Sequence, residues 1–305
     1  MTFAVRVFSS VLLSFGLGLL QAHAVFLPES EIRYDTLKEG RSNMTEEEFK
    51  TLIARVQKEY EPLVALHGGK LTISGDWRSD KLNAAAAQIF GTWRVQISGA
   101  LARRPELTPD GFALILCHEL GHHLGGYALG RPPVPFGGIW AANEGQADYF
   151  ATQVCARKLW GPETARNAEA RKSVDPLARQ KCEAVWSNET DRDLCYRIAV
   201  AVESLSITMM VLKNETQKPS FQTPDPAAVP KTSDAHPATQ CRMDTSLAGA
   251  LCVAYFDEKL IPGKNVAGGP FSVEAEREAA KVSCMKSSGY SEGLRPTCWF
   301  KSQID

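Results

Sequence analysis

The sequence predicts an α+β fold that is mainly helical and contains a small sheet. Apolar residues recur at helical spacing over several long segments, whereas period-two alternation is confined to short stretches. The length of 305 residues is enough to bury the core of one large domain. The formal net charge of −1 gives no basis for binding nucleic acid or an anionic membrane surface.

The N-terminal segment has the pattern of a signal peptide. Arg6 supplies a positive charge, Val11–Leu20 form an apolar run too short to span a bilayer, and AHA at 22–24 is typical of a cleavage site. We therefore expect residues 1–24 to be a signal peptide, with the protein exported to the periplasm or secreted. No stable membrane span is expected in the mature chain. The alternative is an N-terminal membrane anchor.

All eight cysteines follow this segment, and an even number behind a secretion signal indicates disulfides in an oxidising compartment. Short separations favour the pairs Cys182–Cys195 and Cys284–Cys298. The pairing of the remaining four stays open at this point: Cys117, Cys155, Cys241 and Cys252.

Several helices are predicted from apolar spacing and from their end signals. The first covers Thr45–Leu66 and opens with a capping box formed by Thr45 and Glu48. The second has Thr108 as its N-cap and Pro109 in its first turn, and it runs to Gly125-Gly126. Four further helices are expected over Ala141–Trp160, Asp193–Lys213, Thr239–Asp257 and Ser272–Lys286.

Two short runs between the first two helices are predicted to be strands, Leu71–Ser74 and Thr92–Ser98. In the second run Trp93, Val95 and Ile97 alternate with polar residues, which indicates a strand buried on one face.

Two proline-rich segments are predicted to be loops, Arg131–Gly138 and Asn214–Pro237. The run Ile198–Leu212 is the most apolar segment after the leader. Glu203 and three hydroxyl residues interrupt it, so we interpret it as a core helix rather than a membrane span.

The second helix carries the segment LILCHELGHHLGG at 114–126. His118 and His122 are four residues apart, so they share one helical face and can present ring nitrogens to one metal ion. Glu119 lies about 100° around the helix, within reach of a water on that ion. This H-E-x-x-H arrangement predicts two zinc ligands and a general base. The alternative is a set of buried polar residues that satisfy one another by hydrogen bonds.

A catalytic zinc site needs a third protein ligand. The metzincin arrangement would place a histidine at position 128, which is Ala128, so that solution fails. The segment NEGQAD at 143–148 instead supplies Glu144 as the third ligand. Asp148 lies one turn later on the same face, and we assign it to the outer N–H of His118.

The segments LCHELGH, NEGQADYFA and SDAHPATQCR resemble the HtpX and CAAX prenyl protease type of gluzincin metallopeptidase. That family has H-E-x-x-H, then E-x-x-A-D, then an H-P pair shortly before an arginine. The resemblance covers roughly residues 70–155 and 233–245. It implies a zincin-like domain within residues 25–305, with a catalytic core at about 70–260 and a disulfide-stapled C-terminal part. It also implies that His236 polarises the substrate carbonyl or approaches the metal, and that Arg242 organises the site.

We therefore expect a zinc metalloendopeptidase with one Zn²⁺ per chain that hydrolyses peptide bonds of protein or peptide substrates. Glu119 would take a proton from water and hand it to the leaving amine. The substrate would lie extended along an edge strand, and Thr92–Ser98 is the candidate, with Trp93, Val95 and Ile97 as substrate contacts.

Two other classes of function stay open. One is a non-catalytic zinc-binding or chaperone-like protein that retains the protease fold, although a structural zinc site needs no base such as Glu119. The other is a disulfide-rich adhesion or inhibitor module with an incidental motif.

Two neighbours of the ligands are expected to have structural roles. His123 is expected to lie near the negative end of the helix dipole. Cys117 points about 100° away from the metal, so we expect it to form a disulfide with Cys155 or with one of Cys241 and Cys252.

Overall fold

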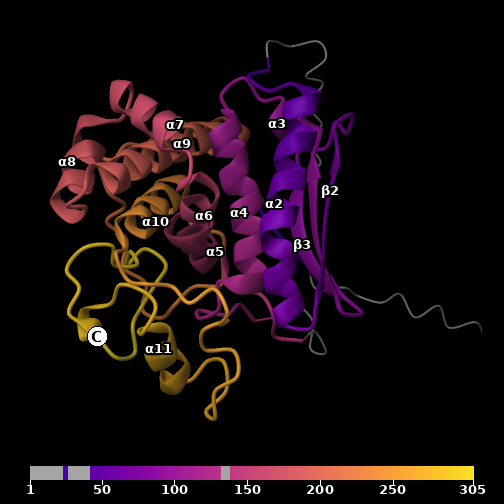
Figure 1. Ribbon diagram of the computed structural model, residues 1–305. Coiled ribbons are helices and arrows are strands. Elements are labelled where there is room, and N and C mark those ends of the chain that lie inside the picture. The colour runs from indigo at the N-terminus through magenta and orange to yellow at the C-terminus, as the bar shows by residue number, and fades with distance from the viewer. Residues whose placement is uncertain (1–22, 27–41, 132–137) are drawn as a thin grey trace, which may run out of the picture.

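A small sheet lies on one side of the protein and layers of helices lie on the other in the computed structural model (Figure 1). The structure describes residues 23–26, 42–131 and 138–305. The expected signal peptide therefore lies outside the described residues, apart from His23 and Ala24. Most of the loop expected over Arg131–Gly138 lies outside them as well.

Within the described residues the sheet has four strands in the order β1-β3-β4-β2. β2 (Lys70–Asp76) and β4 (Thr92–Ser98) are parallel, and β3 (Ala84–Ile89) runs antiparallel to β4. β1 (His23–Val25) runs antiparallel to β3 on its other side. The two strands expected from the sequence are present, but β3 was missed because its run of alanines has low strand propensity.

The turn between β3 and β4 is a tight hairpin. Phe90 and Gly91 have φ angles of 46° and 77°. Two consecutive positive φ angles match the right-handed twist of the strands that such a turn joins. The hairpin pairs β3 with β4, which leaves the other edge of β3 to pair with β1.

β4 is an inner strand, because β3 pairs with one of its edges and β2 with the other. Its backbone is therefore not available to a substrate, and the expectation that Thr92–Ser98 is an edge strand is wrong. Trp93, Val95 and Ile97 are buried in the main core, so they cannot be substrate contacts either. Alternation along a strand reveals which face is buried, but it does not reveal which strands lie on either side.

Two helices cover the inner face of the sheet, α2 (Glu46–Leu66) and α4 (Pro109–Leu124) (Figure 1). The capping box at the start of α2 is confirmed. The N-cap Thr108 and the first-turn proline of α4 are confirmed as well. A four-residue helix, α3 (Gly99–Ala102), joins β4 to the loop before α4.

The next helical stretch has three parts in succession: α5 (Glu144–Phe150), a π-helical segment η1 (Ala151–Cys155) and α6 (Ala156–Trp160). The helix expected over Ala141–Trp160 thus begins three residues late. The reason is that the Asn143 side chain accepts a hydrogen bond from the Gln146 backbone N–H at 2.9 Å and caps α5.

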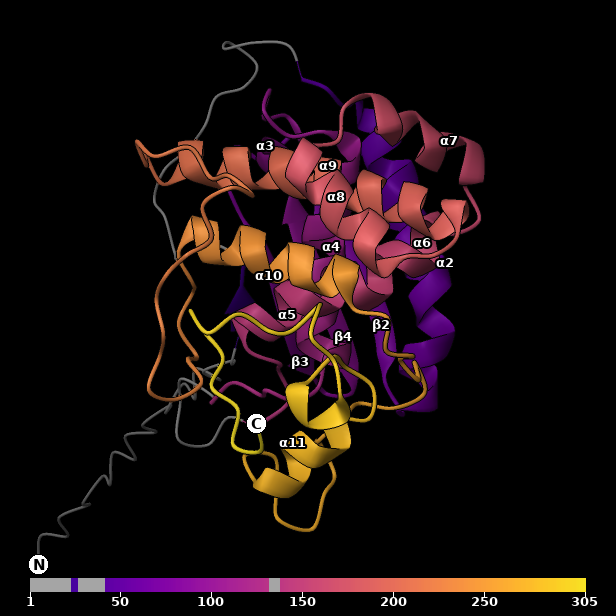
Figure 2. The ribbon, with the colours of Figure 1, turned by 90° about the vertical axis from the view of Figure 1, so that its left-hand side faces the viewer.

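The outer helices pack behind α4 and α5. Figure 2 shows the two longest of them, α9 and α10, side by side. The segments of this layer and of the C-terminal part are α7 (Thr164–Glu169), η2 (Ala170–Lys172), α8 (Pro176–Val185), α9 (Glu189–Leu212), α10 (Thr239–Leu251), α11 (Val273–Ala279) and η3 (Lys286–Ser288). Asn214–Pro237 contains no helix or strand, as expected.

α9 is long and apolar enough to cross a membrane by length and composition, but 72% of its most apolar window is buried inside the protein. This agrees with the interpretation as a core helix. α9 begins at Glu189 rather than Asp193 because Asn188 caps it.

Two helices end earlier than expected. α10 stops at Leu251, because the backbone of Cys252 is extended and its sulfur bonds to Cys284. α11 stops at Ala279, and the chain then turns towards the same disulfide. In both cases the chain leaves the helix close to a cysteine of the Cys252–Cys284 bond.

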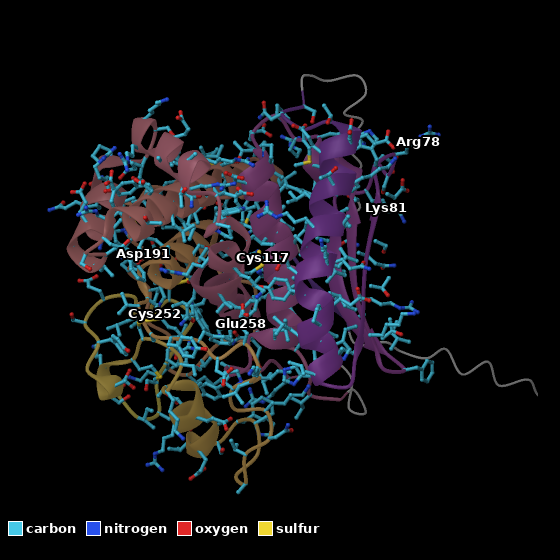
Figure 3. The ribbon with its side chains drawn as sticks, viewed as in Figure 1. Arg78, Lys81, Cys117, Asp191, Cys252 and Glu258 are labelled. Atoms are coloured by element: carbon cyan, nitrogen blue, oxygen red, sulfur yellow. A yellow bond between two sulfur atoms is a disulfide. The ribbon has the colours of Figure 1, made fainter. Side chains whose placement is uncertain are left out.

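Four disulfides link the chain: Cys117–Cys155, Cys182–Cys195, Cys241–Cys298 and Cys252–Cys284. The pair Cys182–Cys195 and the choice of Cys155 for Cys117 are confirmed, but Cys284–Cys298 is wrong. The C-terminal segment folds back, so each of those two cysteines meets an end of α10 instead. Figure 3 shows Cys117 inside the protein on α4, while Arg78 and Lys81 lie at the outer side of the sheet.

Peptide mapping of the unreduced protein should recover four linked peptide pairs, including Cys241–Cys298 and Cys252–Cys284. A covalently linked Cys284–Cys298 pair, or a Cys117 thiol that is alkylated without reductant, would contradict this pairing.

Candidate metal centre

His118 and His122 are buried on one face of α4, with their ring centroids 4.7 Å apart. The Nδ1 atom of His118 lies 2.7 Å from Asp148 Oδ1, and that of His122 lies 2.8 Å from the carbonyl oxygen of Ala142. Because both of these partners are acceptors, each Nδ1 carries a hydrogen, and Arg242 Nη2 also lies 3.2 Å from His118 Nδ1. Each Nε2 therefore points to the inner side of the site, where its lone pair can bind a metal ion once that nitrogen is deprotonated.

Glu144, the first residue of α5, completes the group. Its carboxylate oxygens lie 3.3 Å from His118 Nε2 and 3.6 Å from His122 Nε2. Both Nε2 atoms and Glu144 Oε2 are buried without a hydrogen-bond partner among the described residues. Leaving such atoms unsatisfied is costly, and a metal ion would satisfy all three. The group His118–His122–Glu144 could hold a metal ion.

Glu119 lies beside this group and is fully buried. Neither of its carboxylate oxygens has a hydrogen-bond partner within the part of the chain that the structure describes. Burial raises the pKa of Glu119 to about 8, because desolvation disfavours the carboxylate. A buried carboxyl group with this pKa can both accept and return a proton near neutral pH.

The charged side chains of the group shift one another's pKa values. Burial opposes protonation of His118, but Asp148 and Glu144 outweigh it and raise its pKa to about 9. Burial lowers the pKa of His122 to about 4. Although burial opposes ionisation of Glu144, the two histidines and Arg242 lower its pKa to about 2. At neutral pH the metal-free site therefore keeps both ring nitrogens of His118 protonated, so that the ring is charged.

Arg242 on α10 fixes Asp148 from the other side. Its Nε and Nη2 atoms donate to the two carboxylate oxygens of Asp148 at 2.7 and 2.8 Å. Despite the burial of Asp148, this guanidinium and His118 hold the pKa of that carboxyl well below its usual range. Asp148 is thereby kept ionised and correctly oriented towards His118, so Arg242 acts on the site through Asp148.

Arg242 also contacts the short N-terminal segment. Its Nη1 donates to the carbonyl oxygen of Phe26 at 2.8 Å, and its guanidinium lies 4.3 Å from the centre of the Phe26 ring. The ring of Phe26 in turn meets the ring of His118 edge-on at 5.0 Å. Sequence reasoning did not anticipate this contact, because Phe26 is far from the motifs in sequence.

His236 lies next to the group. Its Nε2 is 3.3 Å from Glu144 Oε1, and about a quarter of the side chain is exposed (26%). The loop that carries it is held by Asn143, whose Nδ2 donates to the Ser233 carbonyl at 2.9 Å. The Ser233 N–H donates to the carbonyl of Trp299 at 2.8 Å. His236 is thus a partly open member of an otherwise buried site.

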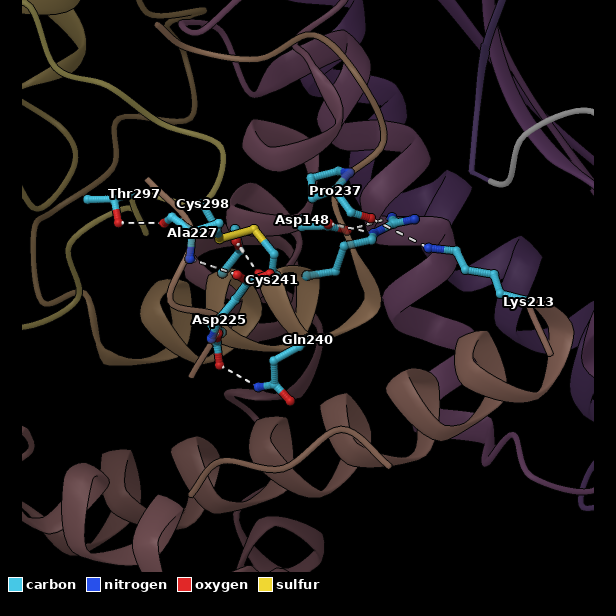
Figure 4. Close-up of a disulfide and its surroundings, with 12 residues drawn as sticks. Asp148, Lys213, Asp225, Ala227, Pro237, Gln240, Cys241, Thr297 and Cys298 are labelled. Carbon is cyan, nitrogen blue, oxygen red and sulfur yellow. Dashed lines mark hydrogen bonds and ion pairs between the residues drawn. A yellow bond between two sulfur atoms is a disulfide. The ribbon is translucent and has the colours of Figure 1, made fainter. Parts of the chain in front are cut away.

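Figure 4 shows how the C-terminal segment and α10 support this loop. The disulfide Cys241–Cys298 joins the segment to α10, and Thr297 Oγ1 donates to the Ala227 carbonyl at 3.0 Å. Lys213 Nζ lies 3.5 Å from the carbonyl oxygen of Pro237. Sequence reasoning missed these supports, because each depends on segments that meet only in the folded chain.

His123 has a different role from the one expected. Its ring is stacked between Trp93 and Trp140, at centroid distances of 5.3 and 5.0 Å. Burial lowers its pKa to about 3, so the ring is neutral and has no charge to interact with the helix dipole. Its Nε2 is 3.1 Å from the Arg94 carbonyl oxygen, so His123 attaches the metal helix to β4.

Gly121 lies between the two histidine ligands, where α4 and α5 approach most closely. A Cβ atom at this position would lie 2.8 Å from both Cα and the carbonyl oxygen of Ala147. Backbone atoms on α5 cannot give way, so any side chain would push the two helices apart. The distance between Glu144 and the histidines therefore depends on this glycine.

Comparison with protein-family models, with curated proteins and with solved structures finds no match for this chain.

Gly121→Ala should weaken binding of a divalent metal and lower the free energy of unfolding by about 1–3 kcal/mol, because the added methyl group overpacks the contact between α4 and α5. Gly138→Ala is the matched control, since nothing lies within 4 Å of the Cβ added there. Metal titration and chemical denaturation measure the two effects. Equal metal affinity in both variants would contradict this account.

Titration with Zn²⁺ at about pH 7 should release about one proton from His118 and part of one from Glu119, because their pKa values in the metal-free site are about 9 and about 8. His122 should release none, since its pKa is about 4. At about pH 10 both groups are already deprotonated, so their share of the release should fall towards zero and leave only the proton of a metal-bound water. Calorimetry in buffers of different ionisation enthalpy measures the number of protons released per zinc bound. A release that does not change between these pH values would contradict the assignment.

Proposed function

We propose that this protein is a zinc metalloendopeptidase with a zincin-like fold that acts outside the cytoplasm. The observation that carries the proposal is the set of three buried metal-donor atoms on His118, His122 and Glu144 that have no hydrogen-bond partner among the described residues, with the carboxylate of Glu119, which has none there either, beside them. A structural metal site closes with a fourth protein ligand and needs no base. An open fourth position next to a carboxylate is typical of a hydrolase.

Zinc suits this donor set, because two neutral imidazoles and a carboxylate match a borderline-soft ion. When bound, Zn²⁺ supplies Lewis-acid activation of water and of a peptide carbonyl. Glu119 accepts the proton of the attacking water and delivers it to the leaving amine. In the metal-free site burial raises the pKa of Glu119 to about 8, and a bound cation would lower it, so that Glu119 is ionised and can accept the proton of the attacking water.

His236 is the group placed to contact the substrate. It is the partly exposed member of the site, and its Nε2 lies 3.3 Å from Glu144 Oε1. From there its ring can donate a hydrogen bond to the substrate carbonyl oxygen as negative charge develops. Arg242 is a positioning residue, because it holds Asp148 against His118 and its own Nη2 lies 3.2 Å from His118 Nδ1.

The substrate backbone would pair with β3 instead of β4. β3 packs against α4, and in the described part of the sheet its outer edge is covered by the three residues of β1 and by Phe26. An extended peptide could add to that edge as a further strand (β-augmentation) and would then run past the metal group. The four disulfides support action in an oxidising compartment, the periplasm or the exterior.

Glu119→Gln should retain one Zn²⁺ per chain but cleave an unfolded protein substrate about 10²- to 10⁴-fold more slowly, because the amide cannot accept the proton. Glu47→Gln is the control, since Glu47 is exposed on α2. Elemental analysis and a fluorescent casein assay, with and without chelator, give the two readouts.

Cleavage by Glu119→Gln at the rate of the unsubstituted chain would contradict the mechanism. Stoichiometric zinc without cleavage in any of these chains would favour the non-catalytic zinc-binding or chaperone-like alternative.

A further inference from the structure

The chain's own residues 23–26 lie where the proposed function places the substrate. β1 pairs antiparallel with β3 in the register His23–Ala87, Ala24–Ala86 and Val25–Ala85. The next residue continues the ladder, because the Phe26 N–H donates to the Ala84 carbonyl at 3.0 Å. This segment therefore uses the same backbone groups of β3 that an extended peptide would need.

Phe26 also reaches the metal group. It is buried, its ring meets His118 edge-on at 5.0 Å, and its carbonyl oxygen accepts a hydrogen bond from Arg242 at 2.8 Å. Phe26 thus contacts three elements: β3 and α4 on one side of the metal group and α10 on the other. A residue that spans the two sides in this way blocks a bound peptide from doing the same.

We propose that His23–Phe26 is an inhibitory strand, which competes with substrate for the β3 edge and uses the aromatic ring of Phe26 as its anchor. The proposal rests on the proposed function. The inhibitory strand also predicts which substrates bind best: peptides that place an aromatic residue at the position of Phe26. The Arg242 guanidinium, 4.3 Å from the centre of the Phe26 ring, and the edge-on ring of His118 both favour an aromatic side chain there.

The cleavage expected after Ala24 falls inside this strand. Cleavage there removes two of the three paired residues of β1 and leaves the contacts of Phe26. The processed chain should therefore be less inhibited than the full chain, so removal of the leader would also release activity.

The first test compares the zinc-loaded full chain with Phe26→Pro, which removes the N–H that donates to Ala84. Its kcat/KM for unfolded protein should rise about tenfold through KM if the strand occupies the edge in about nine-tenths of the molecules. The control is Tyr255→Ala, at a tyrosine that is 81% exposed. Equal kcat/KM in Phe26→Pro and the control would overturn the proposal.

The second test measures binding and needs no catalysis. A labelled peptide HAVFLPES, the sequence of residues 23–30, is titrated by fluorescence anisotropy into full chains that carry Glu119→Gln. It should bind several-fold more tightly when Phe26→Pro is also present, and HAVALPES should bind more weakly than HAVFLPES. Equal binding to both chains, or no binding, would overturn the proposal.

The two tests separate the inhibitory strand from the proposed function. Proteolysis together with equal peptide binding to both chains contradicts the inhibitory strand alone. Tighter peptide binding to Phe26→Pro with no proteolysis in any zinc-loaded chain contradicts the peptidase alone and leaves the competition for the β3 edge supported.

Discussion

The paired hydrogen bonds between Asp148 and Arg242 are the interaction on which the rest of the site depends. They are fully buried, and they join α5 to α10 directly behind His118 on α4. A buried carboxylate and guanidinium stabilise a structure only if their remaining hydrogen-bonding groups are also satisfied, as they are here by His118 and Phe26. Removing either partner would leave an uncompensated charge at the junction of three helices. The orientation of one metal ligand is thus tied to the packing of the whole helical layer.

Covalent links and close packing hold the same junction. The disulfide Cys117–Cys155 joins α4 to the π-helical segment after α5, one residue before the first histidine ligand. Gly121 lets the two helices approach to backbone contact one turn further along α4. The stacked ring of His123 attaches the other face of α4 to β4. α4 is therefore fixed on each side, and the side chains of the candidate metal group on it have little freedom to move.

The parts that could be predicted from the sequence are those with local causes. Capping residues and apolar spacing located α2 and α4, and the helical repeat placed His118 and His122 on one face. Parts that depend on tertiary pairing could not be found in this way. The alanines of β3 form a strand only because β4 and β1 pair with them, and Cys298 bonds to Cys241 because the C-terminal segment folds back. Alternation in β4 revealed its buried face but could not show that both of its edges are occupied.

The support of the His236 loop by residues 297–301 has a consequence for the timing of assembly. A chain made from its N-terminus exposes the metal ligands of α4 and α5 long before it exposes Trp299, whose carbonyl holds Ser233 in this loop. Contacts between segments so distant in sequence form late in folding. A partly synthesised chain thus carries the helix pair with the candidate metal group before it carries the residues that hold the His236 loop. The order of synthesis itself delays the appearance of a complete site until the far end of the chain has folded back and been oxidised.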